Sequence, residues 1–167
     1  MAERRTALVL TISDRAAGGE RDDVSGAAVA ERLAGLGFAV ERATVPDELD
    51  RIEAALVAAA ARHALVVTTG GTGLTPRDVT PQATLAVLDY EVPGFAEAMR
   101  ADGRAKTPLA ILSRAVVGVR QGSLIVNLPG SPRGALESLA SLEPVLDHAL
   151  ETIGGPFEHA GWRDPTA

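Results

Sequence analysis

A buried strand that runs directly into a glycine-rich loop constrains the fold of this chain more than any other stretch. The apolar residues 65–67 predict a strand buried on both faces, and the sequence TTGGTGLTPRDVT follows at residues 68–80. Gly70, Gly71 and Gly73 carry no Cβ atom, so the backbone there can adopt positive φ angles and can approach a ligand closely. The loop therefore predicts a turn whose free N–H groups form an anion-binding concavity.

The residues that end this loop also suit a phosphate or nucleotide. Thr80-Pro81 is typical of a helix N-cap and first helical position, which places a helix N-terminus just beyond the glycines. Asp78 would repel a phosphate unless it holds a metal ion, a cationic partner or a proton. The loop is neither a Walker A motif nor a Rossmann fingerprint, and taken alone it also fits a plain tight turn.

Length and charge exclude several classes of protein. The 167 residues suffice for one domain with a full core, which we expect to be residues 1–154, followed by a tail at 155–167. A net charge of −6 and 3% aromatic residues argue against nucleic-acid binding. The chain has no cysteine and no apolar run long enough for a membrane span. These features predict a soluble cytoplasmic protein without a disulfide framework.

Apolar runs alternate with helical patterns along the chain, and this alternation predicts βαβ units in a mostly parallel sheet. The predicted strands include residues 6–12, 38–45, 65–69, 116–119 and 123–128. Gln121-Gly122 separates the last two runs by a hairpin spacing, so one strand is expected to be antiparallel. Ser25 and Ser131 are expected to cap helices.

Polar segments follow several of these strands, and in a parallel sheet they meet at one edge. They are Ser13-Asp14, Pro46-Asp47, residues 70–78 and residues 127–131. Together they predict a crevice in which carboxylates face phosphate cradles, as Mg²⁺ requires. Each residue also has a simpler interpretation: Asp47 as a helix N-cap, Asp14 as a turn residue and Asn127 as a loop stabiliser.

Three segments closely resemble the bacterial MogA/MoaB family of molybdenum cofactor biosynthesis proteins. They are TTGGTGLTPRDVTPQAT (68–84), TPLAILSRAVVGV (107–119) and LIVNLPGSPRGALESL (124–139). The segments ALVLTISDRAAGG (7–19) and VPDELDRIEAAL (45–56) fit the same family. The resemblance extends over roughly residues 5–153 and implies a three-layer α/β/α sandwich, with a mostly parallel sheet and one antiparallel strand.

The resemblance also implies an activity, molybdopterin adenylyltransferase, in which Mg²⁺ and ATP give adenylylated molybdopterin and pyrophosphate. Asp47 and Asp78 would then be catalytic and would hold Mg²⁺. The residues expected to bind the nucleotide are Gly70, Gly71, Thr72, Gly73, Val79, Thr80, Asn127, Pro129, Gly130 and Ser131. Those expected on the pterin side are Ser13, Asp14, Ser113 and Arg114.

Further expectations come from the family alone. A homotrimer or a dimer of trimers is expected, together with a downstream molybdenum-insertion protein that receives the product. The alternative is a non-catalytic MoaB-type paralogue that binds the pterin without adenylylating it. The presence of both Asp47 and Asp78 favours the active enzyme.

Overall fold

One sheet runs through the described part of the chain, which in this computed structural model is residues 5–155. Its six strands are β1 (Thr6–Ile12), β2 (Ala39–Val45), β3 (Leu65–Thr69), β4 (Tyr90–Glu91), β5 (Val117–Arg120) and β6 (Ser123–Leu128). They lie in the order β2-β1-β3-β6-β5-β4. Strand β1 thus lies between β2 and β3, so the chain order reverses within the sheet, as it does in doubly wound sheets.

The direction of β5 differs from that of the other strands. The β1–β2, β1–β3 and β3–β6 pairs are parallel, whereas β5 pairs antiparallel with both β6 and β4. Gln121 (φ 45°) and Gly122 (φ 83°) form the tight turn between β5 and β6. Positive φ at both positions matches the twist of a two-residue hairpin. The predicted single antiparallel strand is thus confirmed.

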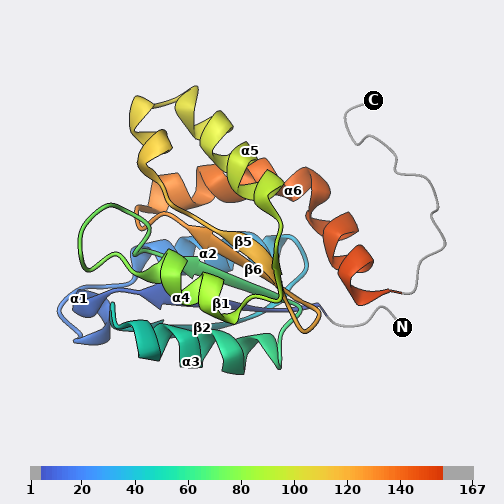
Figure 1. The fold of residues 1–167 in the computed structure, drawn as a ribbon, viewed down its shortest axis with the longest axis horizontal. Helices are drawn as coiled ribbons and strands as arrows, with labels where there is room; N and C mark the ends of the chain where they lie inside the picture. The colour runs from blue at the N-terminus through green and yellow to red at the C-terminus, as the bar shows by residue number, and fades with distance from the viewer. Residues whose placement is uncertain (1–4, 156–167) are drawn as a thin grey trace.

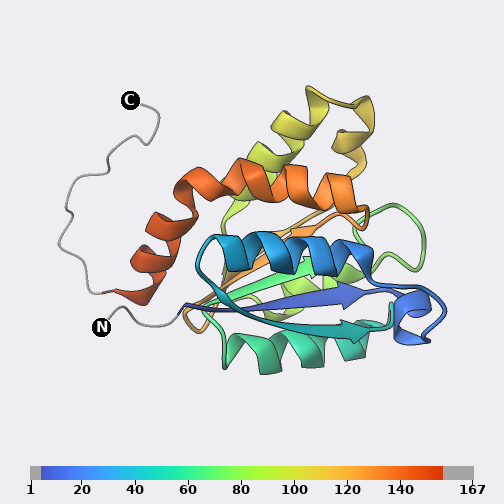
Figure 2. The same ribbon diagram turned by 180° about the vertical axis from the view of Figure 1, so that it is seen from behind.

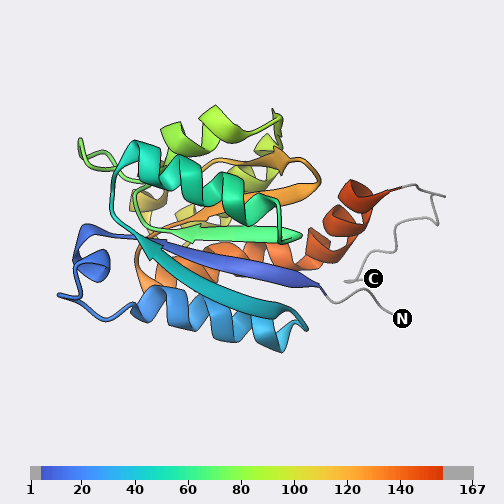
Figure 3. The ribbon, with the colours of Figure 1, turned by 90° about the horizontal axis from the view of Figure 1, so that it is seen from below.

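Helices cover both faces of the sheet. They are α1 (Asp14–Ala17), α2 (Val24–Gly35), α3 (Leu49–Ala60), α4 (Thr80–Val87), α5 (Pro93–Arg104), the 3₁₀ helix η1 (Pro108–Leu112) and α6 (Pro132–Gly154). Helices α3 and α4 lie on one face, and α2, α5 and α6 lie on the other (Figures 1 and 3). This arrangement confirms the expected three-layer α/β/α sandwich.

Alternate residues of each strand supply the two halves of the core. Leu65 and Val67 of β3 pack with α2, α5 and α6, whereas Val66 packs with α3 and α4. All five residues of β3 are buried, as expected of a central parallel strand. The sheet is therefore fixed from both sides, and the loops at its edge stand on a rigid base.

The helix ends correct part of the sequence interpretation. Ser131 caps α6 as predicted, since its side chain accepts the N–H of Gly134. Helix α2, however, is capped by Asp23, whose carboxylate accepts the N–H of Gly26, so the predicted Ser25 cap is wrong. Helix α6 contains Pro144 and changes direction part-way along its length (Figure 2).

The predicted boundary between domain and tail falls where the description of the chain ends. Helix α6 ends at Gly154, and of the tail at 155–167 only Gly155 lies within the described residues. The division into domain and tail stays a prediction. Within residues 5–155, no helix is both long enough and apolar enough to cross a bilayer.

Two glycines give a test of the packing. A Cβ atom on Gly118 of β5 would lie 2.5 Å from the Tyr90 carbonyl and 2.4 Å from Leu88 Cδ1. We expect Gly118→Ala to lower the free energy of unfolding by about 1–3 kcal/mol, because the β4–β5 pair must shift. A Cβ atom on Gly35 of α2 would point into open space, so Gly35→Ala should raise the free energy of unfolding by up to about 1 kcal/mol. Urea denaturation measures both, and equal effects would contradict the described packing.

Candidate active site

The loops after four parallel strands meet at one edge of the sheet. The strand register pairs Ile12 with Val45, Thr11 with Thr69, and Thr69 with Leu128. The chain leaves β1, β2, β3 and β6 there, and the glycine loop and α1 lie at this same end in opposite views (Figures 1 and 2). The predicted convergence of polar segments is therefore present.

Asp14 and Asp47 are joined by two hydrogen bonds, in each of which the backbone N–H of one residue donates to the carboxylate of the other. The N–H of Asp14 donates to Asp47 Oδ2 over 3.0 Å, and the N–H of Asp47 donates to Asp14 Oδ1 over 2.9 Å. This clasp joins α1 to the loop between β2 and α3. Asp47 therefore does not cap α3, whose N-cap is Glu48 without a side-chain bond.

The glycines of the loop after β3 are required by close contacts within the protein. A Cβ atom on Gly70 (φ 97°) would lie 2.4 Å from the Ile12 carbonyl oxygen. One on Gly71 (φ 68°) would lie 2.2 Å from Thr80 Oγ1 and 3.3 Å from Asp47 Oδ1. The loop is thus pressed against the end of β1, and Asp47 faces it.

Asp78 lies on the same loop and near the same glycines. A Cβ atom on Gly73 would lie 2.9 Å from Asp78 Oδ2, and this oxygen accepts the N–H (2.9 Å) and the hydroxyl (2.8 Å) of Thr75. The Asp78 charge is close enough to act on Asp47. Asp14, Asp47, Gly71, Arg77 and Asp78 thus form one group, which we call the carboxylate rim.

The rim sets the protonation of its members in opposite directions. Burial raises the pKa of the Asp47 carboxyl, and the negative charges of Asp14 and Asp78 raise it further. The hydrogen bond from the Asp14 N–H and the positive charge of Arg77 lower it, but by less. Hydrogen bonds from Arg77 lower the pKa of Asp14. The negative charge of Asp47 is therefore poorly compensated, and a cation beside it would stabilise that charge.

Arg114 holds the glycine loop in shape. Its Nε donates to the Gly73 carbonyl over 2.8 Å and its Nη2 to the Asp78 carbonyl over 2.6 Å, while Nη1 contacts Gln82 Oε1 at 3.3 Å. The sequence interpretation placed Arg114 on the pterin side. In the structure its guanidinium binds protein oxygens from three residues, and its place on the pterin side stays a prediction.

The Asn127 and Thr80 side chains are buried and form hydrogen bonds within the protein. The Asn127 side chain is fully buried; it donates to Thr68 Oγ1 (3.1 Å) and Thr84 Oγ1 (2.9 Å) and accepts the N–H of Val116 (3.1 Å). The buried Thr80 hydroxyl donates to the Gly70 carbonyl over 2.9 Å, so it does not cap α4, whose N-cap is Val79. The assignment of Asn127 and Thr80 to the nucleotide site stays a prediction.

Two cavities flank the glycine loop. The first, which we call the apolar cavity, has about 390 Å³ and lies between the loop, α5, η1 and α6; Thr72, Gly73, Met99, Leu109, Ser113 and Pro129 are among its lining residues. The second, which we call the polar cavity, has about 360 Å³, and its lining includes Thr11, Ser13, Asp23, Ser25, Gly70 and Gly130. Ser131 lines both. Ser13 and Ser113, predicted to share the pterin, thus lie in different cavities.

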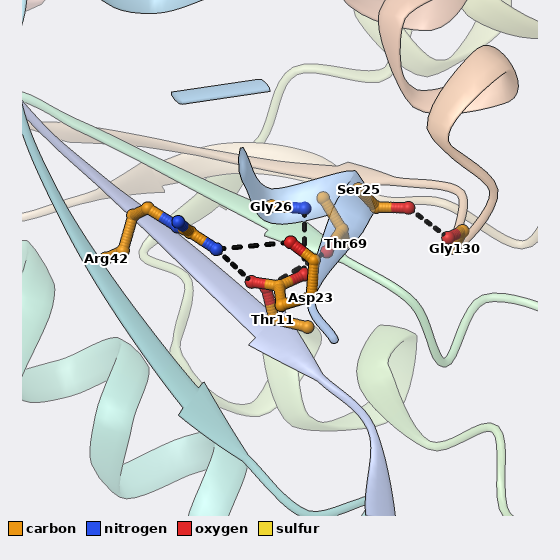
Figure 4. A network of polar contacts seen from close by, with 7 residues as sticks. All are labelled: Thr11, Asp23, Ser25, Gly26, Arg42, Thr69 and Gly130. Atoms are coloured by element: carbon orange, nitrogen blue, oxygen red, sulfur yellow. Dashed lines mark hydrogen bonds and ion pairs between the residues drawn. The ribbon is translucent and has the colours of Figure 1, made fainter. Parts of the chain in front are cut away.

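Asp23 organises the wall of the polar cavity, and the sequence interpretation gave it no role. Its carboxylate accepts hydrogen bonds from Thr11 Oγ1 (2.6 Å), Arg42 Nη2 (2.9 Å) and the N–H of Gly26 (2.9 Å) (Figure 4). Burial opposes its charge, but these bonds keep the pKa of Asp23 below its ordinary value. Beside it, the Ser25 hydroxyl donates to the Gly130 carbonyl (Figure 4).

Residues 8–148 match a family model described as a probable molybdopterin binding domain. The chain belongs to this family. It is 42% identical over 156 residues to a molybdopterin adenylyltransferase of Helicobacter pylori J99, covering 89% of this chain and 88% of that protein. It is 45% identical over 141 residues to that of Escherichia coli K12, covering 81% of this chain and 72% of that protein. The membership expected from the sequence is confirmed.

A solved structure of a family member supports the same fold. The crystal structure of the molybdopterin biosynthesis enzyme MoaB from Thermus thermophilus superposes with a TM-score of 0.83 at 50% identity. The match covers 92% of this chain and 99% of that one. The sheet order and the single reversed strand are thus placed within a known architecture of molybdopterin-binding domains.

The burial of Asp47 predicts a pH-dependent gain in stability when its charge is removed. Its folded-state pKa is raised, so the stability of the wild-type protein falls as pH rises above the unfolded value of about 4. Asp47→Asn lacks this loss, and its amide oxygen can still accept the Asp14 N–H. We expect a higher Tm than wild type at pH 7 and a smaller difference at pH 4. Asp50→Asn, at an exposed position of α3, is the control; a gain as large there would contradict this assignment of the effect to burial.

Proposed function

We propose that this protein is a molybdopterin adenylyltransferase, which transfers AMP from ATP to the phosphate of molybdopterin and releases pyrophosphate. The observation that carries the proposal is that the glycine loop lines two cavities and contacts Asp47 and Asp78 of the carboxylate rim. Gly70 lines the polar cavity, whereas Thr72 and Gly73 line the apolar one. Gly71 lies between them in sequence, with Asp47 beside it. Substrates in the two cavities would therefore meet next to the rim.

The lining of each cavity suits a different substrate. A fused heteroaromatic ring is favoured by mostly apolar walls with a few polar groups, such as the Thr72 and Ser113 hydroxyls in the apolar cavity. Hydroxyl groups and carboxylates suit ribose, and hydroxyl groups and backbone amides suit phosphate; the polar cavity provides these groups at Ser13, Asp23 and Gly70. We therefore propose the apolar cavity for the pterin and the polar cavity for the nucleotide.

Asp47 and Asp78 would hold Mg²⁺, which would neutralise phosphate oxygens as charge develops on them. Within residues 5–155, no three His, Cys, Asp or Glu side chains gather into a metal site of their own. Mg²⁺ needs no such cage, because it typically binds one or two carboxylates together with substrate phosphates and water. The hard oxygen donors and the poorly compensated charge of Asp47 fit an ion that arrives with its nucleotide.

The protein's remaining contribution is alignment. The phosphate oxygen of molybdopterin would attack the α-phosphorus of ATP, and the bond to pyrophosphate would break. Such a transfer depends on the relative position of the reactants and on electrostatic stabilisation more than on covalent help. The bonds of Arg114 and Thr80 to the loop backbone keep Gly70, Gly71 and Gly73 in place without substrate.

Asp78→Asn tests the proposal at the rim. Its amide oxygen can still accept the Thr75 N–H, so the loop should keep its shape while the charge is lost. We expect turnover of molybdopterin with ATP and magnesium to fall about a hundredfold or more, the loss typical of a removed electrostatic contact at a reacting phosphate. Pyrophosphate release measures it, with Asp50→Asn as the control. Wild-type turnover by Asp78→Asn would refute the assigned role.

Calorimetry separates the enzyme from the non-catalytic alternative. An enzyme should bind both molybdopterin and magnesium ATP, because the two cavities are distinct. A paralogue that only carries the pterin should bind molybdopterin alone and release no pyrophosphate. Binding of ATP without turnover would also contradict the proposed activity.

We further propose a cytoplasmic homotrimer, or a dimer of trimers, that passes its product to a molybdenum-insertion protein. The support is the family to which the chain belongs. Light scattering on the purified protein should give three or six times the chain mass of 17.2 kDa. A mass of one or two chains at micromolar concentration would contradict the trimer.

A further inference from the structure

Arg77 is the exposed cation of the carboxylate rim. Its side chain is 60% exposed, and that of its partner Asp14 is 45% exposed. Nη2 lies 2.7 Å from each oxygen of Asp14, and Nε lies 3.1 Å from Oδ2. An ion pair this exposed contributes little to stability, since water and salt compete for both partners. The contact can therefore be exchanged for another anion at small cost.

Neither partner needs the pair to hold its own segment. Asp14 remains joined to Asp47 through the two backbone bonds of the clasp. The loop that carries Arg77 is fixed independently by Arg114 and by the bonds from Thr75 to Asp78. The Arg77 side chain can thus leave Asp14 while α1 and the loop stay in place.

The negative charge of the rim favours movement of the Arg77 side chain from Asp14 to an anion that binds there. Asp14, Asp47 and Asp78 all carry carboxylates, and a polyphosphate would add more negative charge beside them. Arg114 already donates to the Gly73 and Asp78 carbonyls and to the amide oxygen of Gln82. Arg77 presents a planar guanidinium whose geometry matches phosphate as well as carboxylate.

We propose that Arg77 binds the β- and γ-phosphates of the nucleotide. Asp14 pairs with Arg77 when no nucleotide is bound, and it competes with the phosphates for the guanidinium. This inference rests on the proposed function, since it names a further residue of the same site. Asp14 would then weaken polyphosphate binding, although it lies at the site. The Arg77 guanidinium would stabilise the negative charge that develops on pyrophosphate as the bond to the α-phosphorus breaks.

The two partners therefore predict opposite effects on binding of inorganic pyrophosphate, measured by calorimetry. Arg77→Gln should weaken it about tenfold to a hundredfold, the loss expected for a charge-assisted hydrogen bond. Asp14→Asn should tighten it about two- to fivefold, because the competing carboxylate is gone. The matched control is the exposed pair of Arg62 and Glu41 on the opposite end of the sheet, where Arg62→Gln and Glu41→Gln should leave binding unchanged.

Several outcomes overturn the inference. Wild-type affinity in Arg77→Gln, or equal weakening in both variants, would mean that the pair is merely structural. Absence of pyrophosphate binding to the wild-type protein would also overturn it. Should Asp14→Asn fail to fold, Arg77→Lys provides the test instead. This variant retains the charge, so its affinity for pyrophosphate should lie between those of the wild type and Arg77→Gln. An affinity equal to that of Arg77→Gln would contradict the proposal.

The assay is independent of molybdopterin, so the two proposals can fail separately. Opposite effects of Arg77→Gln and Asp14→Asn without adenylyl transfer would support Arg77 and refute the enzyme. Full transfer with unchanged pyrophosphate affinity in every variant would support the enzyme and refute the role of Arg77.

Discussion

The close approach of the glycine loop to the end of β1 determines the rest of the site. Gly70 lies so near the Ile12 carbonyl that a Cβ atom there would be only 2.4 Å from the oxygen. With the loop in this position, Asp78 lies beside Gly73, and Asp47 faces Gly71 from the neighbouring segment. The contact of Gly70 with β1 therefore places the glycine loop next to the segment that carries Asp47.

The negative charges of the carboxylate rim lower the stability of the folded protein at the proposed metal site. Asp47 is half-buried beside two other carboxylates, and this environment raises its pKa, so its ionised form costs the folded protein free energy. A half-buried carboxylate with a raised pKa is typical of functional sites. Around it, neutral contacts such as the fully buried amide of Asn127 hold the strands and α4 without adding charge.

The sequence predicted the scaffold better than the individual contacts. Strand periodicity, the Gln121-Gly122 turn and the polar segments after each strand depend on local chemistry, so the sheet and the gathering of Asp14, Asp47 and Asp78 could be anticipated. Contacts between distant side chains could not. Ser25 and Asp23 are equally good helix caps by composition, and only the tertiary bonds of Asp23 to Thr11 and Arg42 decide between them. Likewise, the bonds of Arg114 to Gly73 arise from packing.

The central claim is that the two cavities share a metal-assisted phosphate site at Asp47 and Asp78. The most direct measurement is anomalous scattering from Mn²⁺, substituted for Mg²⁺, in crystals grown with a non-hydrolysable ATP analogue. We expect one peak within coordination distance of an oxygen from each of Asp47 and Asp78, bridged to the phosphates of an analogue that enters the polar cavity. A manganese ion bound to the analogue but distant from both carboxylates would contradict the claim.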